Sequence, residues 1–389
     1  MRNLIPICIL IICFSCNVND KTSSKQELEY TIHTDTFQLN QGKLHSFFRL
    51  VDINGSTYLF IKYDGVDSLY FYSIHPYRTQ LSKVIKTKNP RLFDFDSEFG
   101  GIRNCYFINE DSAIFFKKSE YESEHLFLYS FKADSVLFSR MFFMEKIYTQ
   151  EDTTTQYYTK NTSRFVWNPI NKSIYLPITF IKKDESNQGL FLVEIFTETG
   201  EEKVLPYKLP QIYNSITQQC RYPFNDNIIG VISQNKKLNY CFGITNEILQ
   251  IDLASGDHRY ISVPHTNFSE PIPYCFEGRI SPDDFGRNMD LTFCYNQFFY
   301  DQKRDVFYRF YKMEMPDINE DGLKTTWKDF QFGFTVLSSD FEEIGEILLD
   351  STVYNYHVSG MRFSNNSIYW LTFSNDTKEF IMRRVEIKF

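Results

Sequence analysis

The stretch NKSIYLPITF (residues 171–180) is a polar turn followed by an apolar, aromatic segment, and the chain repeats this pattern elsewhere. In each copy a turn rich in Asn or Asp leads into an aromatic-rich segment with the composition of a β-strand. The six copies are NGSTYLFIKY (54–63), NEDSAIFFKK (109–118), NKSIYLPITF (171–180), NDNIIGVIS (225–233), DQKRDVFYRFYK (301–312) and NNSIYWLTF (365–373). This repetition predicts one structural unit that occurs six times.

Further strand-like segments accompany the copies. A second apolar segment follows most of them, as in EHLFLYSFKAD (124–134), and a more polar one often comes next, as in SVLFSRMFF (135–143). Another strand precedes the turn, as in HSFFRLVDI (45–53). Four antiparallel strands per repeat are typical of a β-propeller, whose blades stack around an axis because a single blade cannot bury both faces. We therefore predict an all-β fold, a six-bladed β-propeller.

The two ends of the chain carry incomplete units. The last unit ends after three strand-like segments, whereas YTIHTDTFQL (30–39) has no unit of its own. We predict that this N-terminal strand closes the sixth blade. Two β-sandwich domains would show similar short strands, and the long interval 233–300 could hold a seventh or eighth blade. Both alternatives stay open at this point.

The composition supports a β protein and excludes one class of partner. The chain has 39 Phe and 26 Tyr among 389 residues, but its alanines are limited to Ala113, Ala133 and Ala254. Ala favours helices, while aromatic residues favour strands. A formal net charge of −8 and a pI near 5.5 give no basic face for nucleic acid.

The N-terminus has the pattern of an export signal. Arg2 precedes an apolar run over residues 4–14, which is too short for the roughly 20 residues that span a bilayer. Ser15 before Cys16 resembles the lipobox of bacterial lipoproteins, which predicts a signal peptide over residues 1–15 and lipid, such as palmitate, on Cys16. Residues 16–29 would then be the lipidated cysteine and a polar tether, and residues 30–389 one propeller domain. A plain secretory signal and a buried N-terminal thiol are the alternatives.

The cysteines do not form an obvious framework. Of eight, Cys8 and Cys13 leave with the signal peptide and Cys16 carries the lipid. The remaining five show neither a C-x-x-C spacing nor His at zinc-finger spacing, so we predict no metal site and interpret most of them as buried single thiols. They are Cys105, Cys220, Cys241, Cys275 and Cys294. Whether any two of them form a disulfide is open.

No catalytic signature is present, although a Ser/His/Asp triad can be dispersed in sequence. We therefore predict no catalytic residue and no cofactor. The densest polar and aromatic stretch is 270–312, where Asp283 and Asp284 follow a Ser-Pro pair. Two carboxylates can hold a cation or act as acid and base, but after Ser-Pro they more often mark a turn or a helix N-terminus.

Aromatic side chains are the other candidates for ligand contact. Rings exposed on propeller loops could stack on a ligand, although most aromatic residues in such strands pack between blades. The candidates are Tyr274, Phe276, Tyr295 and Trp370.

Several segments together resemble a known family. DSAIFF (111–116), YDQKRDVFYRFYK (300–312), SSDFEEIGEILLD (338–350) and NNSIYWLTF (365–373) are similar to Bacteroidota propeller-like lipoproteins of unknown function, which are relatives of six-bladed NHL and TolB-like propellers. The resemblance implies the propeller and the anchor, and no activity.

Two functions follow from this reading. The first is a non-enzymatic binding or scaffolding propeller for a peptide, a glycan or an envelope protein, attached to a membrane of the cell envelope, preferentially the outer one. The second is a hydrolase or lyase acting on glycans or lactones, which predicts His and carboxylate side chains around the central opening.

Overall fold

The computed structural model describes residues 28–37, 45–54, 56–63, 68–75, 78–87, 102–118, 123–143, 157–159, 165–180, 189–215, 220–221, 227–271, 273–275, 282–326, 329–349, 361–364, 367–374 and 379–388. Within these ranges, no helix combines the length and apolar character that crossing a membrane requires.

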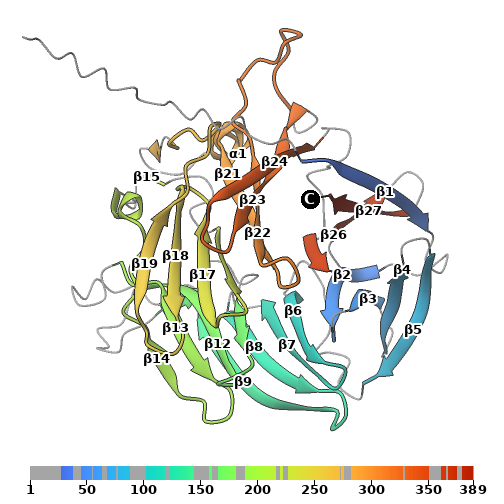
Figure 1. Ribbon diagram of the computed structural model, residues 1–389. Helices are drawn as coiled ribbons and strands as arrows, with labels where there is room; N and C mark the ends of the chain where they lie inside the picture. Colours follow the sequence, from blue (N-terminus) through green and yellow to red (C-terminus); the bar gives the residue numbers. More distant parts are fainter. Residues whose placement is uncertain are drawn as a thin grey trace, which may run out of the picture.

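Six antiparallel sheets follow one another around a ring, which confirms the predicted six-bladed propeller (Figure 1). The first blade contains β2 (His45–Ile53), β3 (Ser56–Tyr63), β4 (Ser68–His75) and β5 (Arg78–Lys86). The second contains β6 (Ile102–Asn109), β7 (Ser112–Lys118), β8 (Ser123–Ser130) and β9 (Ser135–Phe143). The third contains β10 (Tyr157–Thr159), β11 (Val166–Asn168), β12 (Ser173–Phe180), β13 (Leu192–Phe196) and β14 (Glu202–Val204), with β10 and β11 both paired to β12.

The other three blades have the same strand order. The fourth contains β16 (Ile228–Ile232), β17 (Lys237–Phe242), β18 (Glu247–Asp252) and β19 (His258–Ser262). The fifth contains β21 (Cys294–Asp301), β22 (Val306–Lys312), β23 (Phe332–Ser338) and β24 (Glu343–Leu349). The sixth contains β25 (Met361–Ser364), β26 (Ser367–Ser374), β27 (Glu379–Ile387) and β1 (Tyr30–Phe37).

The ends of the chain meet in the sixth blade, as predicted. β1 pairs with β27 through eight residue pairs, from Tyr30 opposite Ile387 to Phe37 opposite Phe380. In Figure 1 the blue β1 lies beside the dark red β27. The first and last segments of the described chain are therefore held together as one sheet.

The repeated Asn- and Asp-rich turns have a backbone reason. In four blades the turn between the first and second strands contains a residue with a left-handed φ of 48° to 58°, a conformation that Asn and Asp tolerate better than most residues. These residues are Asn54, Lys172, Lys236 and Asp305.

One of the six predicted copies corresponds to the first strand of its blade instead of the second. NDNIIGVIS (225–233) forms β16, the first strand of its blade, whereas the other five copies lead into second strands. The equivalent turn follows β16, where the Ser233 hydroxyl donates to the Asn235 side chain at 2.5 Å and Lys236 has φ of 58°. The long interval 233–300 holds β20 (Tyr274–Cys275) and α1 (Pro282–Leu291) between the fourth and fifth blades.

The core consists of six buried clusters, each shared by two neighbouring blades. Between the fifth and sixth blades, for example, Tyr308 and Phe310 pack with Ile368 and Trp370. Large rings fill these wedge-shaped spaces, which explains why the chain uses Phe and Tyr so heavily and Ala so rarely.

A buried arginine also joins the fourth and fifth blades. Arg309 on β22 lies over the Tyr295 ring, 3.3 Å from its centroid, and is almost fully buried. Its guanidinium donates to the Thr245 carbonyl at 2.7 Å, the Asn246 carbonyl at 3.4 Å and Cys241 Sγ at 3.1 Å. Because a buried charge is costly unless it is paired, these acceptors fix the two blades in one register.

The buried tyrosines predict a loss of stability at alkaline pH. Burial is the main cause that raises their pKa above the ordinary value of 10.0 in Tyr63, Tyr175, Tyr240, Tyr295, Tyr308 and Tyr311, and it raises the pKa of Tyr300 to about 12. The folded chain therefore keeps these protons above pH 10, where the unfolded chain releases them. We expect the free energy of unfolding to fall above about pH 10, by up to about 1.4 kcal/mol per pH unit for each such phenol.

Urea unfolding followed by circular dichroism from neutral pH to about pH 12 measures this slope. Tyrosinate absorbance provides the control, because the buried phenols should lose their protons at a higher pH in the native protein than in the protein unfolded by urea. A free energy of unfolding that stays constant above pH 10 would contradict the prediction.

Candidate functional site

A cavity of about 760 Å³ follows the axis of the ring. Its lining includes residues from the first strand of every blade: β2, β6, β11, β16, β21 and β25. The volume lies within the range of roughly 300–1,000 Å³ that is usual for small-molecule sites. This central channel is the part of the described structure to which all six blades contribute.

The channel carries more positive than negative charge. Among the residues that the structure describes, Arg49, Lys236 and Arg362 line it together with a single carboxylate, Asp52. The Asp52 carboxylate accepts a hydrogen bond from the Thr57 hydroxyl at 2.9 Å. The formal charge of the lining is therefore positive in a chain whose net charge is −8.

Aromatic and amide groups complete the lining. Tyr106 on β6 remains 44 % exposed and makes an edge-on contact with Phe165, with 6.4 Å between the ring centroids. Partial burial in the channel raises the pKa of the Tyr106 phenol, the Asp52 carboxylate raises it further, and Arg362 lowers it. Asn104 and Gln297 bring amides to the same cavity. The channel thus combines an accessible ring with neutral and charged donors.

Trp167 supplies another donor. It lines the channel and is only 8 % exposed. Its indole Nε1–H is buried and has no hydrogen-bond acceptor among the residues that the structure describes. An unmade buried hydrogen bond costs about 1–3 kcal/mol, and the Trp167 ring also packs in the cluster between the second and third blades.

Cys105 also faces this cavity and is a free thiol. Burial raises the pKa of the Cys105 thiol to about 11, while Arg49 and Arg362 act in the opposite direction. The thiolate is therefore scarce at neutral pH, and Cys105 is suited to packing rather than to nucleophilic attack.

The described residues among those that the sequence singled out do not line the channel. Tyr274 is half-buried in β20, and Asp284 is exposed in the first turn of α1. Asp283 precedes it in the same turn, so the pair marks a helix start, which was the alternative to a cation or acid–base site. Phe276 and Cys16 lie outside the described residues, as does the side chain of Asp283.

Tyr295 and Trp370 belong to the core. Both side chains are fully buried, Tyr295 between the fourth and fifth blades and Trp370 between the fifth and sixth. Tyr295 additionally donates to the Asn246 side chain at 2.6 Å. Packing between blades, rather than ligand contact, is the role that the structure gives these two rings.

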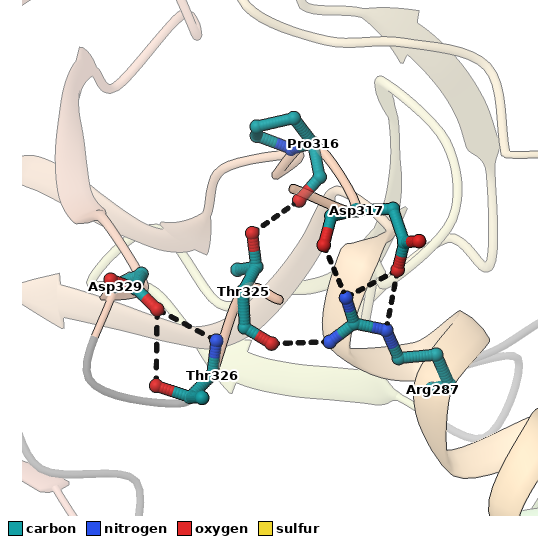
Figure 2. A network of polar contacts seen from close by, with 6 residues as sticks. All are labelled: Arg287, Pro316, Asp317, Thr325, Thr326 and Asp329. Atoms are coloured by element: carbon teal, nitrogen blue, oxygen red, sulfur yellow. Dashed lines mark hydrogen bonds and ion pairs between the residues drawn. The ribbon is translucent and has the colours of Figure 1, made fainter. Parts of the chain in front are cut away.

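Helix α1 is held by an arginine to the long β22–β23 loop (Figure 2). Arg287 Nε donates to the Asp317 carboxylate at 2.8 Å, and Nη2 donates to the Asp317 carbonyl at 2.7 Å. Nη1 donates to the Thr325 carbonyl, and Thr325 in turn donates to the Pro316 carbonyl at 2.5 Å. The polar residues of this segment therefore stabilise a loop.

A second buried polar cluster ties the chain after β19 to the fifth blade. His265 Nε2 lies 2.9 Å from Glu346 Oε1, and the Tyr311 hydroxyl donates to the same oxygen. The backbone N–H of Asn267 donates to His265 Nδ1 at 3.2 Å, so the ring proton lies on Nε2 and is donated to Glu346. This histidine therefore stabilises the packing of the segment after β19 on the fifth blade, and it is not among the residues that line the channel.

A two-stranded sheet joins the connections on either side of the fourth blade. Cys275 in β20 is disulfide-bonded, and its backbone partner across the two-stranded sheet is Cys220 in β15 (Cys220–Arg221). Directly opposed cysteines on paired strands have suitable spacing for a bridge. Cys105, Cys241 and Cys294 are free and buried, as predicted, but Cys275 is not a single thiol. A 3₁₀ helix, η3 (Gln211–Ser215), precedes β15.

A metal centre has no support in the described ranges, where no group of three or more His, Cys, Asp or Glu side chains is placed to hold an ion.

Comparison with known families identifies the chain. A family model described as a domain of unknown function (DUF4221) matches residues 22–348. The chain belongs to the DUF4221 family. No curated protein matches its sequence.

Several solved structures are similar to this DUF4221 chain, and the one with a TM-score above 0.5 shares its fold. A DUF4221 member from Bacteroides vulgatus is 16 % identical, with a TM-score of 0.60, and the match covers 94 % of this chain and 99 % of that one. A putative exported protein from Bacteroides fragilis is 10 % identical, with a TM-score of 0.46 and coverages of 92 % and 96 %. Virginiamycin B lyase from Staphylococcus aureus is 11 % identical, with a TM-score of 0.39 and coverages of 91 % and 99 %. At these identities the likeness concerns the fold alone.

Sequence reasoning missed the channel residues, although a signal was present. First strands surround the axis, so a charged residue within one of them is a candidate for the channel lining. Arg49 in β2 (HSFFRLVDI) and Arg362 in β25 (MRFS) are cationic residues of this kind.

The cysteine assignments give a direct chemical test. Three free thiols and one disulfide predict that the denatured, unreduced protein without its signal peptide and Cys16 has three thiols, and that reduction raises the number to five. The native protein should react slowly, because Cys105, Cys241 and Cys294 are buried. Titration with Ellman's reagent measures the number of reactive thiols in the native, the denatured and the denatured, reduced protein. Five thiols before reduction would contradict the disulfide.

Proposed function

We propose that this DUF4221 chain is a cell-envelope lipoprotein, anchored through Cys16, whose propeller binds a ligand in its central channel without chemically changing it. The observation that carries the binding role is the cavity of about 760 Å³, to which the first strands of all six blades contribute. A peptide, a glycan or a part of another envelope protein is the class of ligand.

Two independent features support the envelope location. The apolar run over residues 4–14 ends at Ser15 and Cys16, which has the pattern of a lipoprotein signal. Cys275 is disulfide-bonded, and disulfides persist mainly in exported proteins. The outer membrane is the proposed site of attachment, with acyl chains on Cys16 as the lipid partner.

The binding role is better supported than a hydrolase or lyase acting on glycans or lactones. Such an enzyme predicts His and carboxylate side chains together at the central opening. Among the described residues of the lining, Asp52 is the single carboxylate and there is no histidine. The other polar and aromatic groups are hydrogen-bond donors and aromatic rings.

The anchor predicts a change of location on mutation. Cys16→Ala removes the sulfur that would carry the lipid, so the protein should move from the membrane fraction to the soluble fraction while keeping its β-sheet spectrum. Fractionation with immunoblotting measures this, and Ser15→Ala, which keeps a small residue before the cysteine, serves as the control. A Cys16→Ala protein that stays in the membrane fraction would disprove the anchor.

The channel predicts where binding is lost. Tyr106→Ala removes an exposed ring from the channel, so it should abolish binding with little effect on stability. Tyr260→Ala on β19, the outer strand of its blade, is the matched control. Glycan and peptide arrays probed with the soluble Cys16→Ala protein reveal the ligand. Array binding that survives Tyr106→Ala would place the ligand outside the channel.

A further inference from the structure

The channel is electrostatically opposite to the rest of the chain. The protein has 49 Asp and Glu against 41 Lys and Arg, yet its channel lining contains three cationic side chains and one anionic one. Cationic side chains that line a cavity create a positive potential there, which attracts anions. From this reversal we propose, on the basis of the binding role above, that the channel binds an acidic oligosaccharide and that Arg49 and Arg362 hold its uronate carboxylates.

The two arginines are positioned to act together. Arg49 lies on β2 and Arg362 on β25, neighbouring first strands that contact each other across the first and sixth blades. Both residues line the same cavity as Cys105 on β6. A guanidinium matches the two oxygens of a carboxylate with parallel hydrogen bonds, which a lysine cannot do.

The other donors suit the hydroxyl and carboxylate oxygens of a sugar acid. Asn104 and Gln297 line the channel with side-chain amides, each of which can donate and accept a hydrogen bond. Gln302 and Asn168 also line the channel with side-chain amides. Sugar hydroxyls can also donate and accept, so the two kinds of group match.

Tyr106 favours a sugar over a small inorganic anion. Its ring is the most exposed aromatic ring among the described lining residues, and an apolar face of that kind packs against the C–H face of a sugar ring but offers nothing to phosphate or sulfate. A carboxylated sugar could pair its carboxylates with the arginines and stack its ring on Tyr106 at the same time.

A matched pair of probes isolates the charge. Isothermal titration of the soluble Cys16→Ala protein is carried out with oligogalacturonate and with its methyl ester, which keeps the sugar backbone and loses the negative charge. Oligomers of mannuronate and of hyaluronan extend the test to other uronates. At least one uronate should bind, and esterification should weaken binding about ten- to a hundredfold, as expected when a charge-assisted hydrogen bond is lost.

Variants assign the effect to the two arginines. Arg49→Gln and Arg362→Gln should each weaken binding of the acid form about tenfold or more and leave the ester unaffected. Arg140→Gln on β9, an exposed arginine on an outer strand, should change neither. Circular dichroism checks that each variant is folded, and the ester comparison stays decisive if Arg49→Gln is not.

The outcomes separate this inference from the proposed function. Equal binding of acid and ester, or acid binding that Arg49→Gln and Arg362→Gln leave intact, would overturn the acidic ligand while leaving a binding channel. Failure of all three uronates would also overturn it. Loss of array binding in Tyr106→Ala would still support the channel in that case.

Discussion

Closure of the ring by β1 and β27 is the constraint on which the rest of the structure depends. Each blade has two faces, and each buried cluster is shared by two blades, so an open row of six blades would leave two apolar faces in water. The pairing from Tyr30–Ile387 to Phe37–Phe380 brings the sixth blade against the first and buries Leu59 and Leu371 in one cluster. Residues more than 300 positions apart thus determine whether the core closes.

The channel is a consequence of this closure. Once six blades surround an axis, their first strands converge, and some of their side chains line a cavity while others pack against a neighbouring blade. Positions such as Phe107 still contribute to the core, while Tyr106 beside it stays accessible, because successive side chains of a strand point to opposite faces. The scaffold therefore decides where a site can form, and a small set of first-strand residues decides its chemistry.

The sequence predicted the ring more completely than the site. Turn residues such as Asn54 and Asp305, and strands rich in Phe and Tyr, are local signals that repeat, so the number of blades and the closing strand could be predicted. Whether a ring packs or binds depends on partners that are distant in sequence. Tyr295 is buried because Arg309 lies over it, and Trp370 because Phe310 packs with it, and neither contact has a local signature. The disulfide of Cys275 could not be predicted for the same reason, because β15 and β20 pair although they are far apart in sequence.

The charge distribution bears on how an anion would reach the channel. A net charge of −8 repels it at long range, while Arg49 and Arg362 attract it only inside the cavity. Salt at physiological strength screens charges in water beyond about 8 Å and so weakens the repulsion, but it screens enclosed groups much less. Association would then become faster as salt rises moderately, while the contacts that retain the ligand persist. Selectivity would thus reside in the rate of dissociation, which the guanidinium groups control at short range.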